Sequence, residues 1–425
     1  MRLPTGPIAR STLRTSAVLG LRLVVQAGTL LLIARLLGPG QFGAFAGVAA
    51  LAVLLGTLST FGTHLVLLGE VSKDRGRREQ VLPYAIPCTI LCGSLLLITY
   101  QAACLWWLEV RNISTSVLLL VGITETLFQP LLALMVSEHH AIGFIARSQL
   151  LQLLPMVLRL GTAGLVFFWQ PSQPLSAYAV GYAMASVFAL IYNLRKLPMC
   201  WPSWREWRLP SKNEWSGALG YAAINITKAG PGELDKALAA RLLSYGSAGI
   251  YVAGARVVGA LVLPIIAMTL SALPRLFRHG HGAAGRNLLV WMYGAALIYS
   301  IFLASVLWLV APGFNLVFGV HYVGISDVIR LLCIAIPGMA LRLVSGNALM
   351  ALGKPWMRVG FEAVGLATLA LASVWLVDSR GAQGLPLALA FAEWGMAIVG
   401  ACLVMQARLE ISRVDRKDLK AGEIK

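Results

Sequence analysis

Charged side chains are scarce in this chain of 425 residues. Lys, Arg, Asp and Glu together make up only 12% of it, whereas a soluble globular chain contains about 25%. Hydrophobic residues reach 58%, and the mean hydropathy is +0.75. A single soluble core cannot bury that share of apolar residues, so the composition excludes a soluble globular protein.

Patterns typical of disulfides, metal sites and catalytic centres are also missing. The six cysteines match neither a disulfide framework nor a zinc site, and we expect them to pack as small apolar groups. Gly353-Lys354 lacks the spacing of a phosphate-binding loop, and Glu138-His139-His140 lacks that of a metalloprotease. We therefore expect no metal, no cofactor and no enzymatic activity. The cysteines are Cys88, Cys92, Cys104, Cys200, Cys333 and Cys402.

What the chain does contain is a series of apolar runs of about 20 residues or more, each long enough to cross a hydrocarbon layer of about 30 Å. Such runs must close their backbone hydrogen bonds internally, which makes them helices. The alternation of a membrane β-barrel is absent. The sequence therefore predicts an all-α integral membrane protein with about twelve transmembrane helices. The expected spans are 13–36, 44–68, 83–108, 114–136, 148–169, 175–194, 217–241, 248–273, 287–311, 324–350, 359–377 and 385–407.

Lys and Arg gather in every second connecting segment. With the N-terminus placed inside, the outside segments hold only Arg111 and Arg380, whereas the inside segments are rich in basic residues. This bias predicts that both termini are cytoplasmic. Basic loops beside anionic lipid headgroups explain most of the net charge of +17, so membrane lipids are expected partners and nucleic acid is not.

Two segments of the chain resemble each other. ARLLGPGQFGAFAGVAALAV begins at Ala34, and ARLLSYGSAGIYVAGARVVG begins 206 residues later at Ala240. Each ends one expected span, turns outside and opens the next. A six-helix repeat returns to its starting side, so the copies are parallel and form two pseudo-symmetric six-helix lobes. The aligned pairs include Gly40 with Gly246, Gly43 with Gly249 and Phe45 with Tyr251.

The expected organisation follows from this repeat. Residues 1–194 form the N-lobe, 217–407 the C-lobe and 408–425 a basic cytoplasmic tail. The connection 195–216 contains four tryptophans among prolines and basic residues. That composition is typical of a segment at the membrane interface, and we expect it to link the lobes on the cytoplasmic side.

Ionisable residues within transmembrane helices are costly, and they usually face the bundle interior or a water-filled cavity. Arg22 lies several residues inside the first span, and Thr15, Gln26 and Thr29 fall within about 40° of it on the helix. Basic residues near span ends instead reach the headgroups. These are Arg14, Arg35, Arg241 and Arg330.

Other spans carry charged residues with a simpler alternative explanation. Glu125 in the fourth span and Arg159 in the fifth either face a shared wet surface or form a local ion pair within one lobe. In the second lobe, Arg342 and Arg256 are further cations. Glu362 and Glu393 are their expected partners.

The span 217–241 is the most polar. Lys228 and Asp235 share one helical face, and Gly230-Pro231-Gly232 between them removes a hydrogen bond and loosens the backbone. A kinked, charged helix is a candidate moving part. In the alternative interpretation, Lys228 with Asp235, or Glu233 with Lys236, forms a pair that only neutralises itself.

Within the spans, cations outnumber acids, so a cavity between the lobes would attract an anionic substrate. The guanidinium fork suits phosphate and pyrophosphate because it makes bidentate hydrogen bonds. The predicted substrate-binding residues are Arg22, Arg159, Lys228, Arg256 and Arg342, and the predicted coupling residues, which would exchange a proton or cation, are Glu125 and Asp235.

Several motifs resemble those of the polysaccharide flippases in the multidrug/oligosaccharidyl-lipid/polysaccharide exporter superfamily. ARLLGPGQFG resembles their A-R-x-L-G-P-x-x-[FY]-G turn, and AGIYVAGARVVG resembles their G-x-Y-x-x-A-x-R stretch. ELDKALAARLL and NALMALGKP resemble later segments. The first span has no acid, unlike drug antiporters of the superfamily, and no extra helices resemble those of lipid II flippases.

The resemblance implies twelve helices in two lobes in the bacterial inner membrane. It also implies that the protein moves an undecaprenyl-pyrophosphate-linked oligosaccharide from the inner to the outer leaflet by alternating access. The product would feed O-antigen or exopolysaccharide synthesis, with a polymerase or other assembly proteins as partners. Two alternatives remain open: a cation-coupled small-molecule exporter of the same superfamily, and a membrane enzyme such as a polysaccharide polymerase, against which the short outside loops argue.

Overall fold

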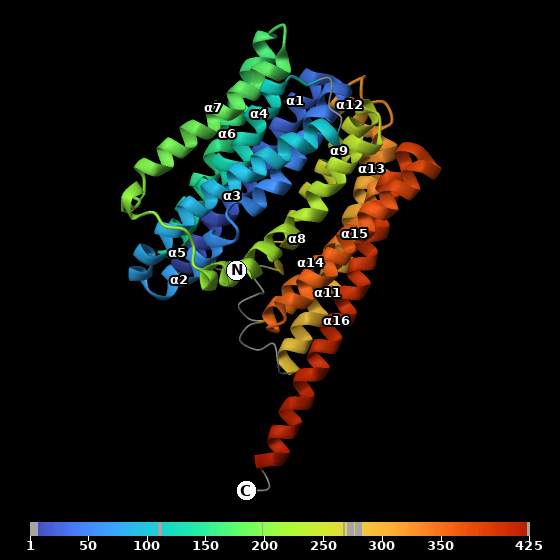
Figure 1. Ribbon diagram of the computed structural model, residues 1–425. Coiled ribbons are helices and arrows are strands. Elements are labelled where there is room, and N and C mark those ends of the chain that lie inside the picture. Colours follow the sequence, from blue (N-terminus) through green and yellow to red (C-terminus); the bar gives the residue numbers. More distant parts are fainter. Residues whose placement is uncertain are drawn as a thin grey trace. The chain divides into compact units, whose positions relative to one another are not determined.

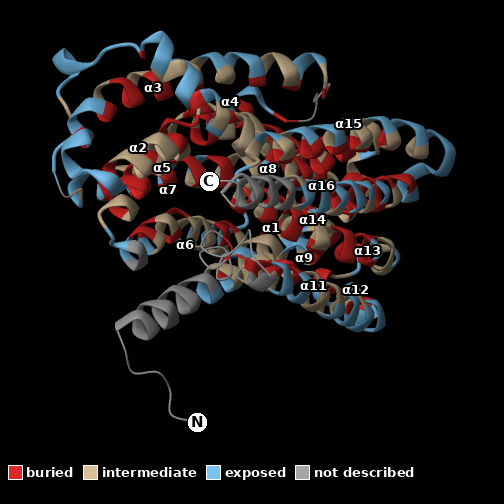
Figure 2. Ribbon diagram, turned by 90° about the horizontal axis from the view of Figure 1, so that it is seen from below, coloured by how far each residue is buried: buried red, intermediate tan, exposed pale blue. Residues whose placement is uncertain are grey.

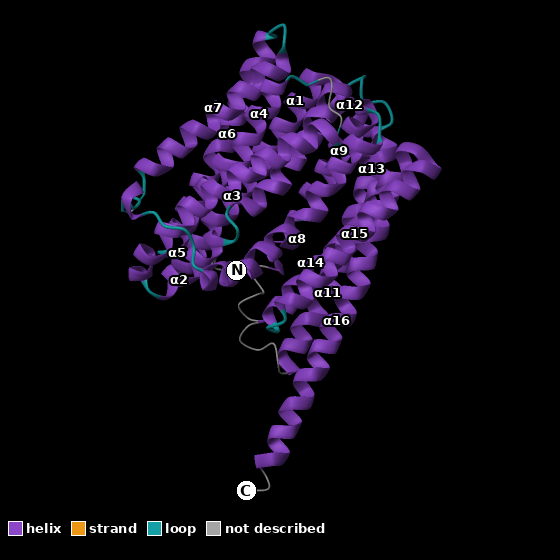
Figure 3. Cartoon of the chain, in the orientation of Figure 1, coloured by secondary structure: helices purple, strands orange, loops and turns teal. Residues whose placement is uncertain are grey.

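The computed structural model describes residues 7–108, 113–197, 199–266, 268–269, 276 and 283–422. In these residues the chain consists of helices joined by short loops, without a strand (Figure 3). Eight helices in the described part are long and apolar enough to cross a membrane, or nine if the bent pair Ile325–Cys333 and Ala335–Ala351 is one span. Two of the eight, Gly20–Ser59 and Pro355–Glu410, contain 40 and 56 residues, enough for two crossings each at about 20 residues per crossing. The all-α membrane fold is confirmed, and the count of about twelve stays a prediction.

The helices of the first part of the chain are α1 (Pro7–Ser59), α2 (Thr63–Lys73), η1 (Arg75–Arg77), α3 (Arg78–Trp106), α4 (Thr115–Ile123), η2 (Thr124–Phe128), α5 (Gln129–Ala141), α6 (Ile145–Trp169), α7 (Pro174–Arg195), η3 (Trp204–Glu206) and α8 (Lys212–Leu242) (Figure 1). Those that follow are α9 (Tyr245–Leu261), α11 (Ala283–Val310), η4 (Ala311–Gly313), α12 (Phe314–Phe318), α13 (Ile325–Cys333), α14 (Ala335–Ala351), α15 (Pro355–Arg380), η5 (Gly381–Gln383) and α16 (Gly384–Gly422).

The chain divides into two compact units. Unit 1 comprises Met1–Ala229 and Ser244–Gly249, and unit 2 comprises Gly230–Leu243 and Ile250–Lys425. The division falls within α8, at the Gly230-Pro231-Gly232 sequence, and α8 continues as a helix through Pro231. The predicted lobes, linker and tail stay predictions, since compactness alone does not define a repeat.

In unit 1, α1 packs against α3 and α6, α6 against α7, and α2 against α5. Within α1 the helical conformation breaks at Gly38, with φ 66° and ψ 169°, a backbone conformation that glycine adopts readily. This break separates the first two expected spans. The expected span 44–68 is wrong in its second half, because α1 ends at Ser59 and α2 begins at Thr63 after a turn in which Phe61 and Gly62 have positive φ. The Phe61 ring packs edge-on against Trp215, 4.6 Å between ring centroids.

The linker segment, residues 196–211, is held against unit 1 by hydrogen bonds. Arg78 pairs with Glu138 (2.6 Å), and both side chains are buried. Arg78 also donates to the carbonyls of Met199 and Cys200 at 2.9 and 3.1 Å, and the Trp201 indole donates to Glu138 at 3.2 Å. The buried ion pair therefore fixes the start of the linker segment.

A proline pair in α3 explains the second attachment of the linker segment. Pro87 has no N–H to donate to the Pro83 carbonyl one turn earlier, and the backbone N–H of Arg208 donates to that carbonyl instead, at 3.0 Å. The Arg208 guanidinium lies over the Tyr84 ring and forms two hydrogen bonds with Glu214. These hydrogen bonds lower the pKa of the Glu214 carboxyl to about 2, so the pair stays ionised at neutral pH.

We expect Arg78→Gln to release the linker segment, because the substitution leaves Glu138 buried without its cation. Chymotrypsin should then cleave at Trp204 and Trp207 severalfold faster than in the unaltered protein. Arg77→Gln is the matched control, since Arg77 is half exposed and pairs with Glu70 at the surface. Equal cleavage rates in Arg78→Gln and the unaltered protein would show that the ion pair does not hold the segment.

In unit 2, α14 packs against α16 and α11, and α15 against α16. Figure 2 shows that a single helix of this unit, for example α15, carries both buried and exposed residues. A 43° bend separates α13 from α14. Pro337 has no N–H for the Cys333 carbonyl, and the Trp394 indole donates to the neighbouring Ile334 carbonyl at 2.9 Å. Within the expected span 248–273, α9 ends at Leu261, and residues 267 and 270–273 lie outside the described part.

Candidate functional site

Arg22 lies in the first half of α1 and is half-buried. Among the described residues, none forms a hydrogen bond or an ion pair with it. Gln26, one turn further along, is exposed, and the Thr29 hydroxyl donates to the Val25 carbonyl of its own helix. Arg22 is therefore a positive charge inside an apolar helix, and its guanidinium donors can bind an external anion.

Glu125 and Arg159 form a buried cluster in unit 1. Arg159 donates to Glu125 at 3.1 Å, to Tyr182 at 2.9 Å and to Ser186 at 2.9 Å. The Tyr182 hydroxyl also donates to Glu125, and its ring lies 3.6 Å below the Arg159 guanidinium carbon. Only 14% of the Arg159 side chain is exposed. This arrangement is the local ion pair that the sequence left open as the alternative.

The backbone around Glu125 is unusual. Residues Thr124–Phe128 form a single π-helical turn between α4 and α5, a distortion common at functional sites. The widened turn brings the Glu125 carbonyl so close to Gly56 of α1 that a Cβ at Gly56 would lie 2.3 Å from it. Glycine at this position lets α1 approach the turn that carries the acid.

Asp235 occupies a comparable setting in unit 2. It lies in the second half of α8, is 2% exposed, and accepts hydrogen bonds from Tyr251 at 2.9 Å and from Lys236 at 3.2 Å. Lys236 also donates to the Gly232 carbonyl, which lies four residues earlier. Each predicted coupling acid is thus buried beside one cation and one tyrosine, although the two sites use different helices.

Arg342 belongs to a larger charged cluster in unit 2. Its Nε donates to Glu393 at 2.6 Å, and its Nη1 lies 3.9 Å from Glu362. Arg358 donates to Glu362 at 3.1 Å. All four side chains are at least nine-tenths buried. The expected pairing of Arg342 with these two glutamates is confirmed.

Arg256 and Lys228 are more accessible. Arg256 forms a bidentate pair with Glu233 at 3.2 and 3.3 Å, yet 42% of its side chain is exposed. The expected pairing of Arg256 with Glu362 or Glu393 is therefore wrong. Lys228 is exposed, and it lies near enough to His64 for its charge to act on that side chain.

The self-neutralising pairs expected in the span 217–241 are also wrong in their partners. Asp235 pairs with Lys236 rather than Lys228, and Glu233 pairs with Arg256 rather than Lys236. Residues i and i+3 or i and i+7 share a face of the helix, but Asp235 found its cation in the adjacent residue of α8, and Glu233 found its cation in α9. Sequence reasoning also missed the site residues Tyr182, Ser186, Tyr251 and Arg358. A search for polar residues on apolar spans would find the first three, and Arg358 directly precedes such a span.

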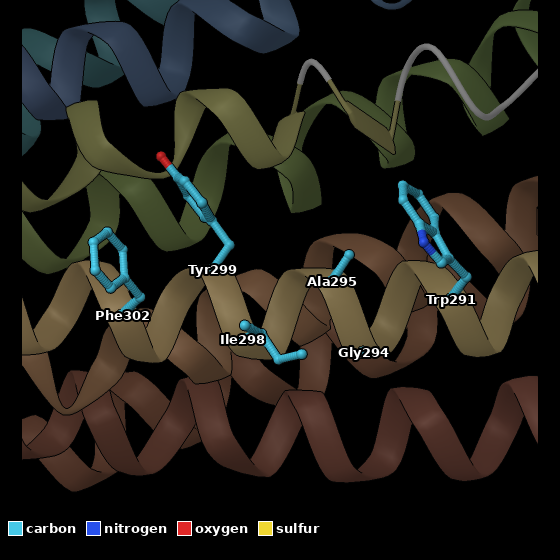
Figure 4. A pocket seen from close by; sticks show the side chains of 6 residues that line it. All are labelled: Trp291, Gly294, Ala295, Ile298, Tyr299 and Phe302. Atoms are coloured by element: carbon cyan, nitrogen blue, oxygen red, sulfur yellow. The ribbon is translucent and has the colours of Figure 1, made fainter.

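A shallow apolar pocket of about 550 Å³ lies along α11 of unit 2 (Figure 4). No charged candidate residue lines it, so it offers no recognition of an anionic group. Its lining suits an apolar chain or a lipid tail. The lining residues are Trp291, Gly294, Ala295, Ile298, Tyr299 and Phe302.

A family model described as polysaccharide biosynthesis protein matches residues 8–279, more than half of the chain. The chain belongs to this family. The resemblance drawn from the sequence motifs is therefore confirmed. A comparison with curated proteins returns no match.

The fold is that of solved transporters in the multidrug/oligosaccharidyl-lipid/polysaccharide superfamily. An inward-facing multidrug resistance MATE family transporter matches with a TM-score of 0.70 and 12% identity, over 93% of this chain and 95% of its own. The lipid II flippase MurJ matches with a TM-score of 0.70 and 13% identity, over 93% of this chain and 89% of its own. A superfamily transporter from Pyrococcus furiosus matches with a TM-score of 0.66 and 13% identity, over 95% of this chain and 94% of its own. At these identities the likeness establishes the fold.

Proposed function

We propose that this family member is a flippase for a lipid-linked oligosaccharide in the bacterial inner membrane. It would move an undecaprenyl-pyrophosphate-linked glycan from the inner to the outer leaflet by alternating access, for O-antigen or exopolysaccharide synthesis. Family membership supports the pathway, and the fold shared with MurJ and MATE transporters supports transport. The observation that carries the proposal is Arg22, a cation inside an apolar helix with no ion pair among the described residues.

The charged candidates divide by accessibility. Arg22 and Lys228 of unit 1 and Arg256 of unit 2 present donors that a pyrophosphate can reach. Arg159 and Arg342 are held in buried clusters. We assign the first three to headgroup binding and the other two to positioning their helices. Glu125 and Asp235 remain the predicted coupling residues, each able to exchange a proton only if its cation and tyrosine rearrange.

Deleting the gene tests this function against the alternative of a small-molecule exporter. The proposal predicts loss of the surface polysaccharide, accumulation of its lipid-linked precursor and unchanged sensitivity to drugs. Restoring the gene on a plasmid should reverse the first two effects. Increased drug sensitivity with a normal surface polysaccharide would overturn the proposal in favour of the exporter.

A further inference from the structure

The two aligned glycines of the internal repeat touch each other through the backbone. A Cβ at Gly43 would lie 2.0 Å from the Tyr245 carbonyl oxygen and 2.5 Å from the Gly249 nitrogen. A Cβ at Gly249 would lie 2.0 Å from the Pro39 carbonyl oxygen. Contacts this short leave no room for a methyl group on either residue, so α1 and α9 meet at their backbones.

The contact is also reciprocal. Pro39 and Tyr245 are 206 residues apart, as are Gly43 and Gly249. Gly43 meets Tyr245, the counterpart of Pro39, and Gly249 meets Pro39, the counterpart of Tyr245. Such a reciprocal contact is typical of an interface on a two-fold axis. The internal repeat therefore meets itself at this point, and small residues allow the close approach, as they do between other membrane helices.

The course of the chain gives this contact a special position. Residues Ser244–Gly249 belong to unit 1, whereas the chain before and after them belongs to unit 2. Ser244 caps the start of α9, since its Oγ accepts from the Ser247 N–H at 3.3 Å. Ala248 within this segment is fully buried. The segment therefore belongs to unit 1, although the residues before and after it in the sequence belong to unit 2.

The loop charges predict that both turns of the repeat lie on the outer side of the membrane. We propose that the Gly43–Gly249 contact is the outer seal of the transport pathway, closed in this structure and separated whenever the pathway opens outward. This inference rests on the proposed transport function, but not on the identity of the substrate. Two glycine backbones can separate without exposing a buried ion pair. Such a contact therefore suits a seal that opens in every transport cycle.

Accessibility of a buried cysteine tests the seal. Ala248→Cys, in a chain without its native cysteines, is treated in intact cells with a membrane-impermeant cationic methanethiosulfonate reagent. We expect slow modification, because the position is reached only when the contact opens. Adding Gly43→Ala or Gly249→Ala should speed modification at least about tenfold, since a methyl group prevents closure.

The repeat supplies its own controls. Gly40 and Gly246 are aligned with each other, and a Cβ at either meets no atom within 4 Å. Gly40→Ala and Gly246→Ala should therefore leave the modification rate unchanged. The seal is overturned if Ala248→Cys never reacts without the glycine substitutions, or if the control substitutions speed the reaction as much. Because the readout needs no transport substrate, failure of the glycan assignment would leave this result intact.

Discussion

Replacing Arg342 by Gln should destabilise the protein by about 3–5 kcal/mol, the usual effect of removing one partner from a buried ion pair. Arg342 lies between Glu393 and Glu362, and both carboxylates are 1% exposed. Without the guanidinium, two buried acids face each other with only Arg358 to offset their charge. The measurement is the thermal unfolding midpoint of the purified protein in detergent.

A control and a rescue separate this structural role from substrate binding. Arg330→Gln, in the same unit, breaks a largely exposed pair with Asp327 and should cost no more than about 1 kcal/mol. Adding Glu393→Gln to Arg342→Gln should recover part of the lost stability, because it removes the stranded charge. An Arg342→Gln protein that is as stable as the unaltered one, yet inactive, would instead place Arg342 in the substrate site.

Arg22→Ala should have the opposite profile, with stability kept and transport lost. No described residue depends on Arg22 for a hydrogen bond, so its removal leaves no partner unpaired. Hydrogen bonds to a charged group contribute about 1.5–3 kcal/mol, which corresponds to about a 10- to 100-fold loss of transport at 1.4 kcal/mol per tenfold. The readout is the amount of surface polysaccharide in a deletion strain carrying the variant, with protein amounts matched.

Two further variants sharpen this test. Arg22→Lys should keep part of the activity, because the charge remains while the bidentate fork is lost. Gln26→Ala, one turn away and more exposed than Arg22, should be close to unaltered. Full export of the glycan by Arg22→Ala at normal protein levels would show that Arg22 does not bind the headgroup.

Hydrophobic length predicted most of the helices. The expected spans 148–169 and 175–194 coincide with α6 and α7 to within three residues at each end, because a bilayer dictates how long an apolar helix must be. The break between α1 and α2 was not predictable, since Phe61 adopts a positive φ that its residue type does not favour. Composition indicated an interfacial linker, but not that an orphaned Pro83 carbonyl would hold it.

The charged residues were found, whereas their partners were found only in part: those of Arg159 and Arg342 were, and those of Arg256 and Asp235 were not. Each predicted site residue is a polar group on an apolar span, and that contrast is visible in the sequence. Partner choice depends on which helices pack together, so Arg256 finds Glu233 of α8 rather than a glutamate of α15 or α16. Pairing with acids occupies Arg159, Arg342 and Lys236, so fewer cations are left to bind an anion, although the excess of cations over acids is the same. Arg22 forms no hydrogen bond or ion pair with a described residue, and its role in substrate binding stays a prediction.

Flipping of a lipid-linked oligosaccharide by the purified protein tests the central claim most directly. Proteoliposomes carrying a polyprenyl-pyrophosphate oligosaccharide would be treated with a glycosidase that cannot cross the membrane, after outer-leaflet substrate has been consumed. The proposal predicts continued cleavage as inner-leaflet substrate appears outside, at least about tenfold slower with Arg22→Ala and unchanged with Arg330→Gln. Cleavage that stops at the outer-leaflet fraction with the unaltered protein, as in protein-free vesicles, would contradict it.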